Sequence, residues 1–266
     1  MNAIRFRYGP VPTLLLSALL SCLWIQLSAQ QQGRLLFEIK IYHIRTDAQR
    51  QVTEHYLETA ELPALHRLGI RPVGVFEPVT PEDSDFRIYE LIPFRSFSGF
   101  ESLPGKLRLD KQYRSDGAQY LDAPYNDPAY ARMEVILLRA FPKMPGIRVP
   151  SLTAPKSSRV YELRSYENSS EQYNLNKVKM FNLGGEISLF KRLNFNAVFY
   201  AEVLSGARMP NLMYLTTFEN KADRDTHWNA FSNDPQWKAL SSSDQYQHNV
   251  IRADILFLRP LDFSDL

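Results

Sequence analysis

The segment FEIKIYHI (residues 37–44) has a counterpart late in the chain, VYELRSYEN (residues 160–168). In each segment an acidic, a basic and a tyrosine side chain stand at alternate positions, which is typical of a strand with one polar and one apolar face. The two sets lie 124 residues apart: Glu38-x-Lys40-x-Tyr42 and Glu162-x-Arg164-x-Tyr166. This recurrence indicates that the chain contains two copies of one domain.

Other elements recur in the same order. RIYELIPF (residues 87–94) matches NLMYLTTF (residues 211–218) at the same offset of 124. The tripeptide Asn-Asp-Pro occurs at residues 126–128 and again at residues 233–235, which are 107 apart. If the two tripeptides are equivalent, the first copy has about seventeen additional residues between Phe94 and Asn126. Asp234 before Pro235 also predicts a helix start, with the aspartate as N-cap.

Each copy predicts the same series of elements. A strand is followed by a capping box, Thr46-x-x-Gln49 or Ser169-x-x-Gln172, which opens a helix. Breaks in that helix are expected at Pro63 and at Gly184-Gly185, and ends at Gly69 and Asn194. Two strands, a second helical region and a last strand complete each copy. The last strand is predicted at residues 133–138 in the first copy and at residues 253–258 in the second. The order β-α-β-β-α-β is that of a ferredoxin-like domain.

The predicted organisation is therefore α+β, with two tandem ferredoxin-like domains at residues 34–141 and 159–260. Residues 142–158 contain prolines at positions 142, 145, 150 and 155 and predict an extended, semi-rigid linker. A single such domain leaves one face of its sheet uncovered. Two in one chain can cover each other, forming a pseudo-dimeric α+β barrel with helices outside.

Residues 1–29 have the pattern of a secretory signal peptide. Arg5 and Arg7 precede an apolar run over residues 13–27, and Ser28-Ala29 offers small residues for cleavage. Lipid attachment at Cys22 is the alternative, although the apolar run continues beyond that cysteine. We expect an exported, periplasmic or secreted protein with no integral membrane segment in its mature form.

Removal of residues 1–29 takes away two arginines and no acid, so the formal charge of +2 falls to zero. A neutral chain gives no electrostatic reason to expect nucleic acid or an anionic membrane as partner. The single cysteine, Cys22, is removed as well, so no disulfide is expected in the mature chain.

The second copy resembles the NIPSNAP family of the dimeric α/β-barrel superfamily. The resemblance is carried by the following residues: Glu162-x-Arg164-x-Tyr166, Phe218-x-x-Lys221-x-x-Arg224, Trp228 and Asp234-Pro235-x-Trp237. The first copy keeps Asp127-Pro128-x-Tyr130 but lacks a clear Arg/Trp pair. The resemblance implies two tandem barrel-forming domains over residues 34–260. It implies no particular reaction, and relatives in the wider superfamily include cofactor-free monooxygenases, isomerases and haem enzymes.

The polar residues of the two first strands are the candidate site. If Phe37, Ile39 and Ile41 face the helices, the polar residues face the barrel interior. The resulting predictions are catalytic roles for Glu38, Glu162 and Arg164, and ligand binding by Lys40, Tyr42 and Tyr166. A structural network of ion pairs is the alternative. In the functional interpretation a glutamate is the general base, and Arg164 or a tyrosine stabilises an enolate or phenolate.

No metal or cofactor is predicted. The five histidines form no HxH or HExxH pattern, and no cysteine supports them in the mature chain (His43, His55, His66, His227 and His248). His43, at the end of the first strand, is the one position where haem ligation is conceivable, although a hydrogen-bonded structural histidine is the simpler interpretation.

Two functions follow from the sequence. The first is binding, or oxygenase-, isomerase- or lyase-type processing, of a small organic molecule in the barrel pocket. The alternative is a non-enzymatic binding or interaction module with a filled barrel, in which residues 95–123 make the contacts. A homo-oligomer is compatible with both. A ligand-sized cavity lined by the polar residues favours the first function, and a filled, dry barrel interior favours the second.

Overall fold

The computed structural model describes residues 33–80 and 85–266. The predicted signal peptide and Cys22 lie outside these residues. Arg34–Leu266 form one compact unit. Within the described residues, no helix is both long and apolar enough to cross a membrane.

Both halves of the unit follow the predicted β-α-β-β-α-β order. The first half contains β1 (Leu36–Ile44), α2 (Asp47–Tyr56), the π-helix η1 (Leu57–Glu61), α3 (Leu62–Arg67), β2 (Gly74–Pro78), β3 (Phe86–Phe94), α4 (Phe97–Leu109), α5 (Lys111–Asp116), α6 (Ala118–Leu121) and β4 (Arg132–Ala140). The second half contains β5 (Val160–Glu167), α7 (Glu171–Asn182), α8 (Glu186–Arg192), β6 (Phe199–Ser205), β7 (Asn211–Phe218), α9 (Lys221–Asn233), α10 (Pro235–Ser241) and β8 (Arg252–Pro260).

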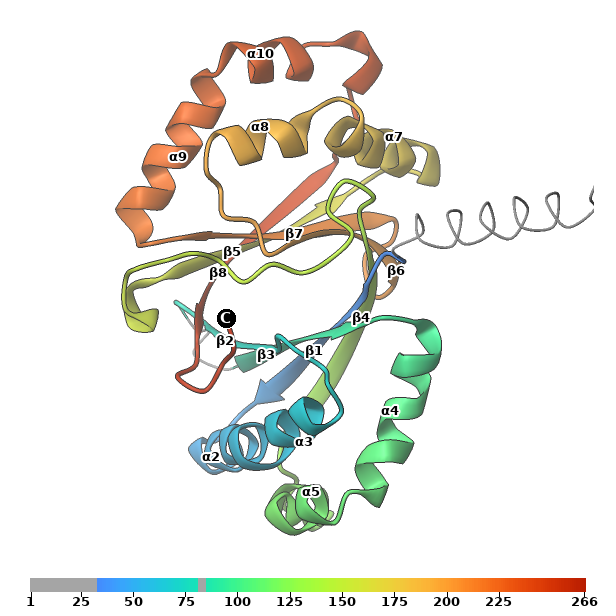
Figure 1. The fold of residues 1–266 in the computed structure, drawn as a ribbon, viewed down its shortest axis with the longest axis vertical. Helices are drawn as coiled ribbons and strands as arrows, with labels where there is room; N and C mark the ends of the chain where they lie inside the picture. Colours follow the sequence, from blue (N-terminus) through green and yellow to red (C-terminus); the bar gives the residue numbers. More distant parts are fainter. Residues whose placement is uncertain (1–32, 81–84) are drawn as a thin grey trace, which may run out of the picture. The chain divides into compact units, whose positions relative to one another are not determined.

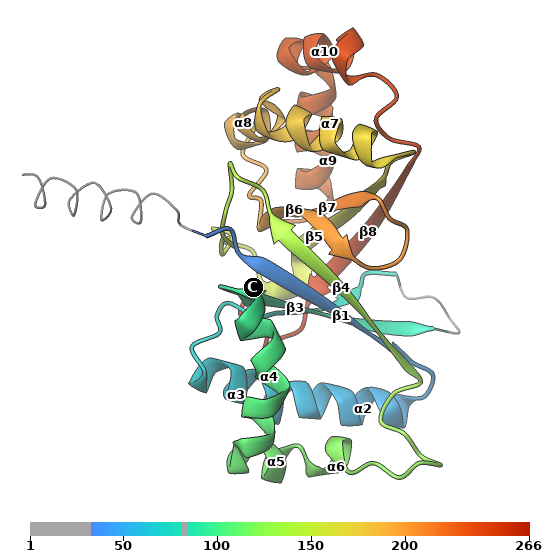
Figure 2. The same cartoon turned by 90° about the vertical axis from the view of Figure 1, so that its right-hand side faces the viewer.

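The strands form one closed antiparallel barrel in the order β1-β3-β2-β8-β5-β7-β6-β4. Each half contributes a four-stranded sheet, and the two sheets are joined where β2 pairs with β8 and β4 pairs with β6. Figures 1 and 2 show the helices of the first half covering one side of the barrel and those of the second half covering the opposite side. The predicted pseudo-dimeric α+β barrel is confirmed.

The barrel interior is filled by apolar side chains from both sheets. Phe37, Ile39 and Leu163 are buried there in one cluster with residues of β2, β3, β6 and β7. The residual cavity at the centre has a volume of about 10 Å³, which is too small for a ligand and at the lower limit for one water molecule. The interior is therefore a packed core.

The predicted orientation of the first strands was wrong. The apolar residues of β1 and β5 face the barrel interior, and the polar residues face the helices of their own half. The physical reason is that the space between two facing sheets is the driest place in the fold and takes large apolar side chains. The sheet–helix layer receives polar partners from the helices and opens to solvent at its margin, so it tolerates charged groups better.

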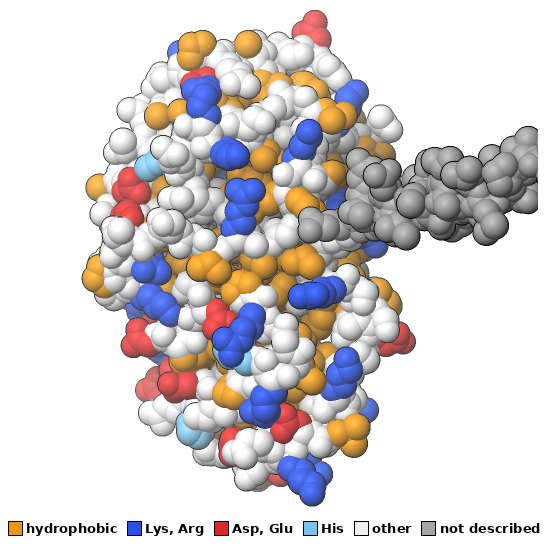
Figure 3. Space-filling model, viewed as in Figure 1, with side chains coloured by type: hydrophobic (Ala, Val, Ile, Leu, Met, Phe, Trp, Pro, Cys, Tyr) orange, Lys and Arg blue, Asp and Glu red, His pale blue; other side chains and the backbone are white. Residues whose placement is uncertain are grey.

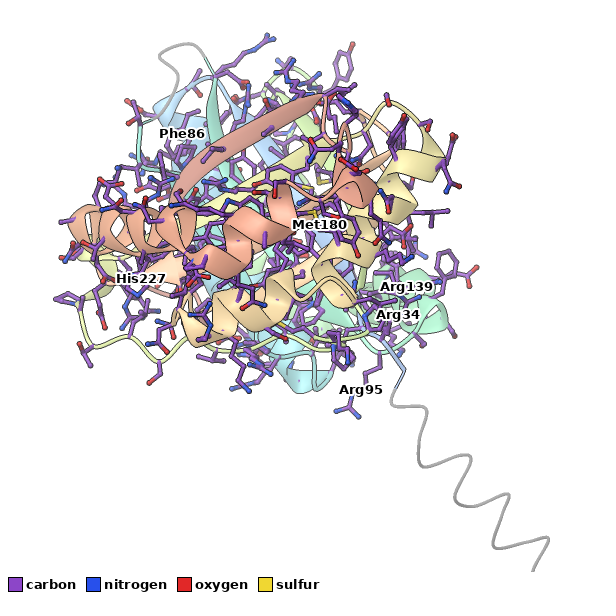
Figure 4. The ribbon with its side chains drawn as sticks, turned by 90° about the horizontal axis from the view of Figure 1, so that it is seen from above. Arg34, Phe86, Arg95, Arg139, Met180 and His227 are labelled. Atoms are coloured by element: carbon purple, nitrogen blue, oxygen red, sulfur yellow. The ribbon has the colours of Figure 1, made fainter. Side chains whose placement is uncertain are left out.

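Helix ends follow the predicted chemistry with one shift. Thr46 caps α2, accepting from the backbone N–H of Gln49, whereas Ser170, not Ser169, caps α7. Gly69 and Asn194 adopt left-handed backbone angles at the ends of α3 and α8. In the helix layer of the second half, Met180 lies on α7 and His227 on α9 (Figure 4).

The two Asn-Asp-Pro tripeptides are not equivalent. Asp234 caps α10 as predicted, with Pro235 at its first position, but Asp127 lies in a turn. The structural counterpart of Asp234 is Asp110, which caps α5. Because α5 and α10 begin 124 residues apart and β4 and β8 begin 120 apart, the first half has four additional residues between these elements. The predicted insertion of about seventeen residues was wrong.

The linker over residues 142–158 begins with a turn at residues 142–144, ends in the 3₁₀ helix η2 (Lys156–Ser158) and is tied to the second half. The backbone N–H groups of Thr153 and Ala154 donate to the carboxylate of Glu219 at 2.6–3.0 Å. Arg148 N–H donates to the carbonyl of Val198. On the face in Figure 3, basic and acidic side chains are interspersed with apolar patches.

Candidate functional site

The first half contains an open cavity of about 820 Å³ between the polar face of β1 and its helices. This is within the range of small-molecule sites. Its inner wall is formed by polar residues of β1, α2 and η1. Its outer wall is formed by residues of α4, α5 and α6 and includes charged side chains of both signs. The lining residues are Glu38, Lys40, Tyr42, Tyr56, Glu61, Phe100, Glu101, Leu103, Pro104, Leu107, Arg108, Tyr113, Arg114, Tyr120, Leu121, Asp122 and Met133. Three residues predicted as site residues, those of β1, therefore lie together in this cavity.

Glu38 is a buried acid of this cavity whose side chain is not engaged by hydrogen bonds. It is 6% exposed and its carboxylate accepts no hydrogen bond from the described residues, although Lys40 and Glu61 are near enough to act on it electrostatically. Burial, with the charge of Glu61, raises the pKa of the Glu38 carboxyl above its ordinary value, against the opposing effect of Lys40. A carboxylate in this state is suited to accept a proton.

Behind Glu38 lies a buried cluster of one ammonium and two further carboxyl groups. Lys40 Nζ donates to Glu61 Oε1 at 2.6 Å and lies 3.3 Å from Glu90 Oε2. Tyr42 OH bridges the same two carboxyl groups, at 3.4 Å from Glu61 and 3.2 Å from Glu90. Glu90 Oε1 is buried and has no hydrogen-bond partner among the described residues.

The ionisable groups of this cluster differ in how strongly they hold a proton. Burial, together with the charge of Glu61, raises the pKa of Glu90 to about 8, so this carboxyl is largely protonated at neutral pH. Burial acts to lower the pKa of Lys40, but Glu61, Glu90 and Glu38 outweigh it and raise that pKa well above its ordinary value. Lys40 is thus a permanent cation and no candidate for a base.

Four tyrosines complete the polar lining. Tyr56 OH and Tyr113 OH share a hydrogen bond of 2.8 Å, and the ring of Tyr56 stacks on that of Tyr120 at 3.8 Å. Burial raises the pKa of the phenols of Tyr42, Tyr56 and Tyr120 above the ordinary value. They therefore stay neutral and can donate hydrogen bonds to a ligand.

Glu61 reaches the cavity because of the π-helix η1. The backbone N–H of Leu62 bonds the carbonyl of Leu57, five residues back. The next residue, Pro63, cannot donate to a carbonyl of the preceding turn, and the wider turn accommodates its ring. Sequence reasoning found the break at Pro63 but missed Glu61 and Glu90. The available signal was an isolated glutamate in an apolar context, in AELPAL and YELIPF.

The second half has the same strand pattern but a different arrangement. Both carboxylate oxygens of the fully buried Glu162 are occupied. Arg164 and Arg224 donate to them at 2.7–2.9 Å, and Trp228 Nε1 donates at 2.7 Å. Burial acts to raise the pKa of Glu162, but the two arginines outweigh it and lower that pKa. In this geometry Glu162 is ionised, and its hydrogen bonds to Arg224 and Trp228 join β5 to α9.

The neighbours of Glu162 are equally engaged. The Arg164 guanidinium stacks on Trp228 at 3.6 Å from the ring centroid and donates to Tyr166 OH at 2.9 Å. Tyr166 OH in turn bonds Tyr214 OH at 2.7 Å. The cavity beside them has a volume of about 350 Å³, less than half that of the first half. The structure therefore places Glu162, Arg164 and Tyr166 apart from Glu38, Lys40 and Tyr42, although both sets were predicted to form one site.

Two positions on the second helical region account for this difference. Arg224 and Trp228 on α9 supply donors to Glu162, whereas Phe100 and Pro104 hold the corresponding positions on α4, at the offset of 124. Phenylalanine and proline offer no side-chain donor. Among the described residues, Glu38 is therefore left without a hydrogen-bonding partner. The cavity of the first half is also larger than that of the second half, where the indole of Trp228 is part of the lining.

His43, the histidine considered for haem ligation, has hydrogen-bonding partners on the neighbouring strands and loop. His43 Nδ1 lies 2.8 Å from Asp85 Oδ1, and His43 Nε2 lies 3.1 Å from Glu134 Oε1 and from Arg132 Nη2. Within the described part of the chain, no three His, Cys, Asp or Glu side chains form a group able to hold a metal ion. The interpretation of His43 as a hydrogen-bonded edge residue is the one this geometry favours.

Fold and site together define a ferredoxin-like α+β barrel protein whose polar sites lie between each sheet and its helices. Residues 161–265, within the second half of the chain, match the family model NIPSNAP. No curated protein matches the chain in sequence.

Solved structures with similar folds include a candidate monooxygenase from Lactobacillus acidophilus, at a TM-score of 0.54 and 12% identity, over 86% of this chain and 94% of that one. A candidate monooxygenase from Fusobacterium nucleatum has a TM-score of 0.55 and 8% identity, over 86% and 93%. A NIPSNAP-like domain protein from Burkholderia xenovorans covers 40% of this chain and 88% of its own, at 18% identity and a TM-score of 0.36. At these identities the likeness concerns the fold.

Proposed function

We propose that the first half binds a small, uncharged organic molecule in the cavity above Glu38 and moves a proton to or from it. The observation that carries this proposal is the state of Glu38: a nearly buried carboxylate, without a hydrogen-bond partner among the described residues, that lines a cavity of about 820 Å³. Burying such a group destabilises a fold unless something else selects for it.

The cavity supports a simple division of roles. Glu38 takes a proton from an acidic C–H or O–H group of the ligand, which becomes an enolate or phenolate. Lys40, held as a cation by Glu61 and Glu90, lowers the energy of that anion through its charge. The neutral phenols of Tyr56 and Tyr120 hold the ligand by hydrogen bonds and ring contacts.

The fate of the anion decides the reaction class. Return of the proton from Glu38 to a different carbon gives an isomerase, and loss of a leaving group from the neighbouring carbon gives a lyase. An oxygenase would use the same first step, with molecular oxygen as the co-reactant. The names of the monooxygenase-like structures are consistent with that third course. All three require the same carboxylate.

The charge of the inner wall selects the ligand class. Glu38, Glu61 and Glu90 face a single ammonium, so the wall is neutral or negative at every protonation state with at least one ionised carboxylate. Arg108 and Arg114 add positive charge on the outer wall, but an anion placed beside Glu38 would meet the inner carboxylates. The part of the ligand that reaches Glu38 is therefore best neutral, as in a ring with an enolisable carbonyl or a phenolic hydroxyl.

The test is a ligand screen on the whole chain followed by two matched variants. Neutral phenols and cyclic ketones are screened by ligand-observed NMR, and hits are followed for proton exchange with deuterated solvent. Glu38→Gln should reduce exchange by about 10²- to 10⁴-fold while binding is retained. Glu162→Gln should leave exchange per folded molecule unchanged. Equal exchange in Glu38→Gln and the parent chain would refute the proposal.

Binding without reaction is the second candidate. The filled barrel interior, with only about 10 Å³ unoccupied, is the arrangement expected for a non-enzymatic module. Residues 95–123 do not form an added contact segment, however, because α4 and α5 correspond to α9 and α10. Hits that bind at the Glu38 cavity but show no exchange above the rate in buffer would support this candidate.

A further inference from the structure

A separate cavity of about 520 Å³ lies between the linker and the second half. It is bounded by linker residues 143–151, by α8 and by the segment that leads from α8 into β6. We call it the linker cavity. It shares no lining residue with the Glu38 cavity of the first half, so the two can be tested independently.

The titratable side chains around the linker cavity, apart from one tyrosine, are all cations. Lys143 and Arg148 come from the linker and Lys191 from α8. No Asp or Glu lines the cavity, and none of the three cations forms an ion pair or a side-chain hydrogen bond within the described residues. Three exposed cations that line one cavity without a carboxylate create a positive potential that attracts an anion.

The floor of the linker cavity is aromatic. Phe190, Phe195 and Tyr200 line it and are each at most 2% exposed. Phe190 and Phe195 contact each other at 4.7 Å between ring centroids. The Tyr200 hydroxyl makes no hydrogen bond within the described residues, and burial raises its pKa, so it is an unused neutral donor.

The backbone around this cavity is defined by specific features of the second half. Asn194 and Asn196 adopt left-handed angles that turn the chain between α8 and β6. A hydrogen bond of 3.0 Å from Arg148 N–H to the carbonyl of Val198 fixes the linker opposite this turn. In the first half, Val75 holds the position of Tyr200, because Val75 on β2 pairs with Glu90 as Tyr200 on β6 pairs with Tyr214. The unused hydroxyl is therefore specific to the second half.

We propose that the linker cavity binds a small aromatic carboxylate. The ring lies against the floor of Phe190 and Phe195, and the carboxylate is held by Arg148 and the neighbouring lysines, with the Tyr200 hydroxyl available as a neutral donor. The volume fits one or two fused rings. The Glu38 cavity differs in that carboxylates as well as cations line it.

The experiment compares two probes of equal shape, 2-naphthoate and 2-naphthamide, by isothermal titration calorimetry and protein-observed NMR on the whole chain. The acid should bind at least about tenfold more tightly than the amide, an advantage that falls as salt rises. The double variant Arg148→Gln/Lys191→Gln should lose about tenfold in affinity for the acid. Lys179→Gln, an exposed lysine of α7, is the matched control and should bind like the parent chain.

Tyr200→Phe removes only the hydroxyl and so tests its contribution to binding. This variant should bind the acid more weakly than the parent chain and have the same melting temperature. Three outcomes would overturn the proposal: equal affinity for acid and amide, unchanged acid binding in the double variant, or no binding of the acid at millimolar concentration. Because Glu38 is not involved, these outcomes leave the proton-transfer proposal unaffected.

Discussion

The two halves of this chain place the same side chains on the same strand and use them differently. Glu38 on β1 and Glu162 on β5 hold equivalent positions. Glu162 accepts hydrogen bonds from two arginines and a tryptophan, whereas Glu38 accepts none from the described residues and lines an open cavity. The difference lies in the facing helix, where Arg224 and Trp228 of α9 correspond to Phe100 and Pro104 of α4.

This comparison shows how duplication can separate stability from function. Once a barrel is closed by two copies, one copy can hold its strand carboxylate in a saturated ion-pair network. The other can lose the donors and expose the same carboxylate to a ligand. Four changes test the comparison, beginning with the largest expected effect.

Glu162→Gln should lower the free energy of unfolding by about 3–5 kcal/mol, because it removes the negative partner of two nearly buried guanidiniums. Glu38→Gln should be neutral or slightly stabilising at pH 7, since burial already disfavours the charged form of that residue. Urea denaturation of both variants measures the contrast. Similar losses in the two variants would show that the halves do not differ as described.

Importing the second half's residues into the first should close the Glu38 cavity. Phe100→Arg/Pro104→Trp places a guanidinium and an indole where Arg224 and Trp228 stand in the other half. Any ligand of this cavity should bind about 100-fold more weakly, and stability should be retained because Glu38 gains donors. Leu109→Trp, at a position of the same helix that is 84% exposed, is the control for a large side chain. Unchanged ligand affinity in the double variant argues against this location of the site.

Stability should depend on pH through Glu90 in the first half. Its folded pKa of about 8 lies above the ordinary value of 4.5, so the folded state binds the proton more tightly than the unfolded state. This stabilisation is complete below about pH 4.5 and is lost as pH rises through about 8, with a slope of at most about 1.4 kcal/mol per pH unit.

Glu90→Gln should therefore gain stability relative to the parent chain as pH rises from 5 to 9, by on the order of 2 kcal/mol. Its counterpart in the second half is Tyr214, whose pKa is raised further above neutrality by burial. Tyr214→Phe should show no such trend in this pH range. Parallel curves for Glu90→Gln and the parent chain, measured by urea denaturation at each pH, would refute the assignment.

Sequence patterns were sufficient for the architecture because alternation and repeats are local properties. They could not decide which face of β1 points into the barrel, since both faces are buried and the choice depends on what the other sheet presents. The Glu38 cavity required knowledge of Glu61 and Glu90, which are 23 and 52 residues away along the chain and are brought together only by the fold. The prediction placed the polar residues of β1 on the wrong side of the sheet.

The smallest expected effect is on the melting temperature, and it tests whether α5 and α10 are equivalent helices. Asp110→Ala and Asp234→Ala each remove the N-cap of a short helix, α5 and α10, and each should lower the melting temperature by a few degrees. Asp127→Ala should have no effect, because Asp127 caps no helix among the described residues although its tripeptide Asn-Asp-Pro is identical to that at Asp234. Differential scanning calorimetry of the three variants measures this pattern. If Asp127→Ala lowered the melting temperature as much as Asp234→Ala does, the two tripeptides would be equivalent after all. Asp110 would then not be the counterpart of Asp234.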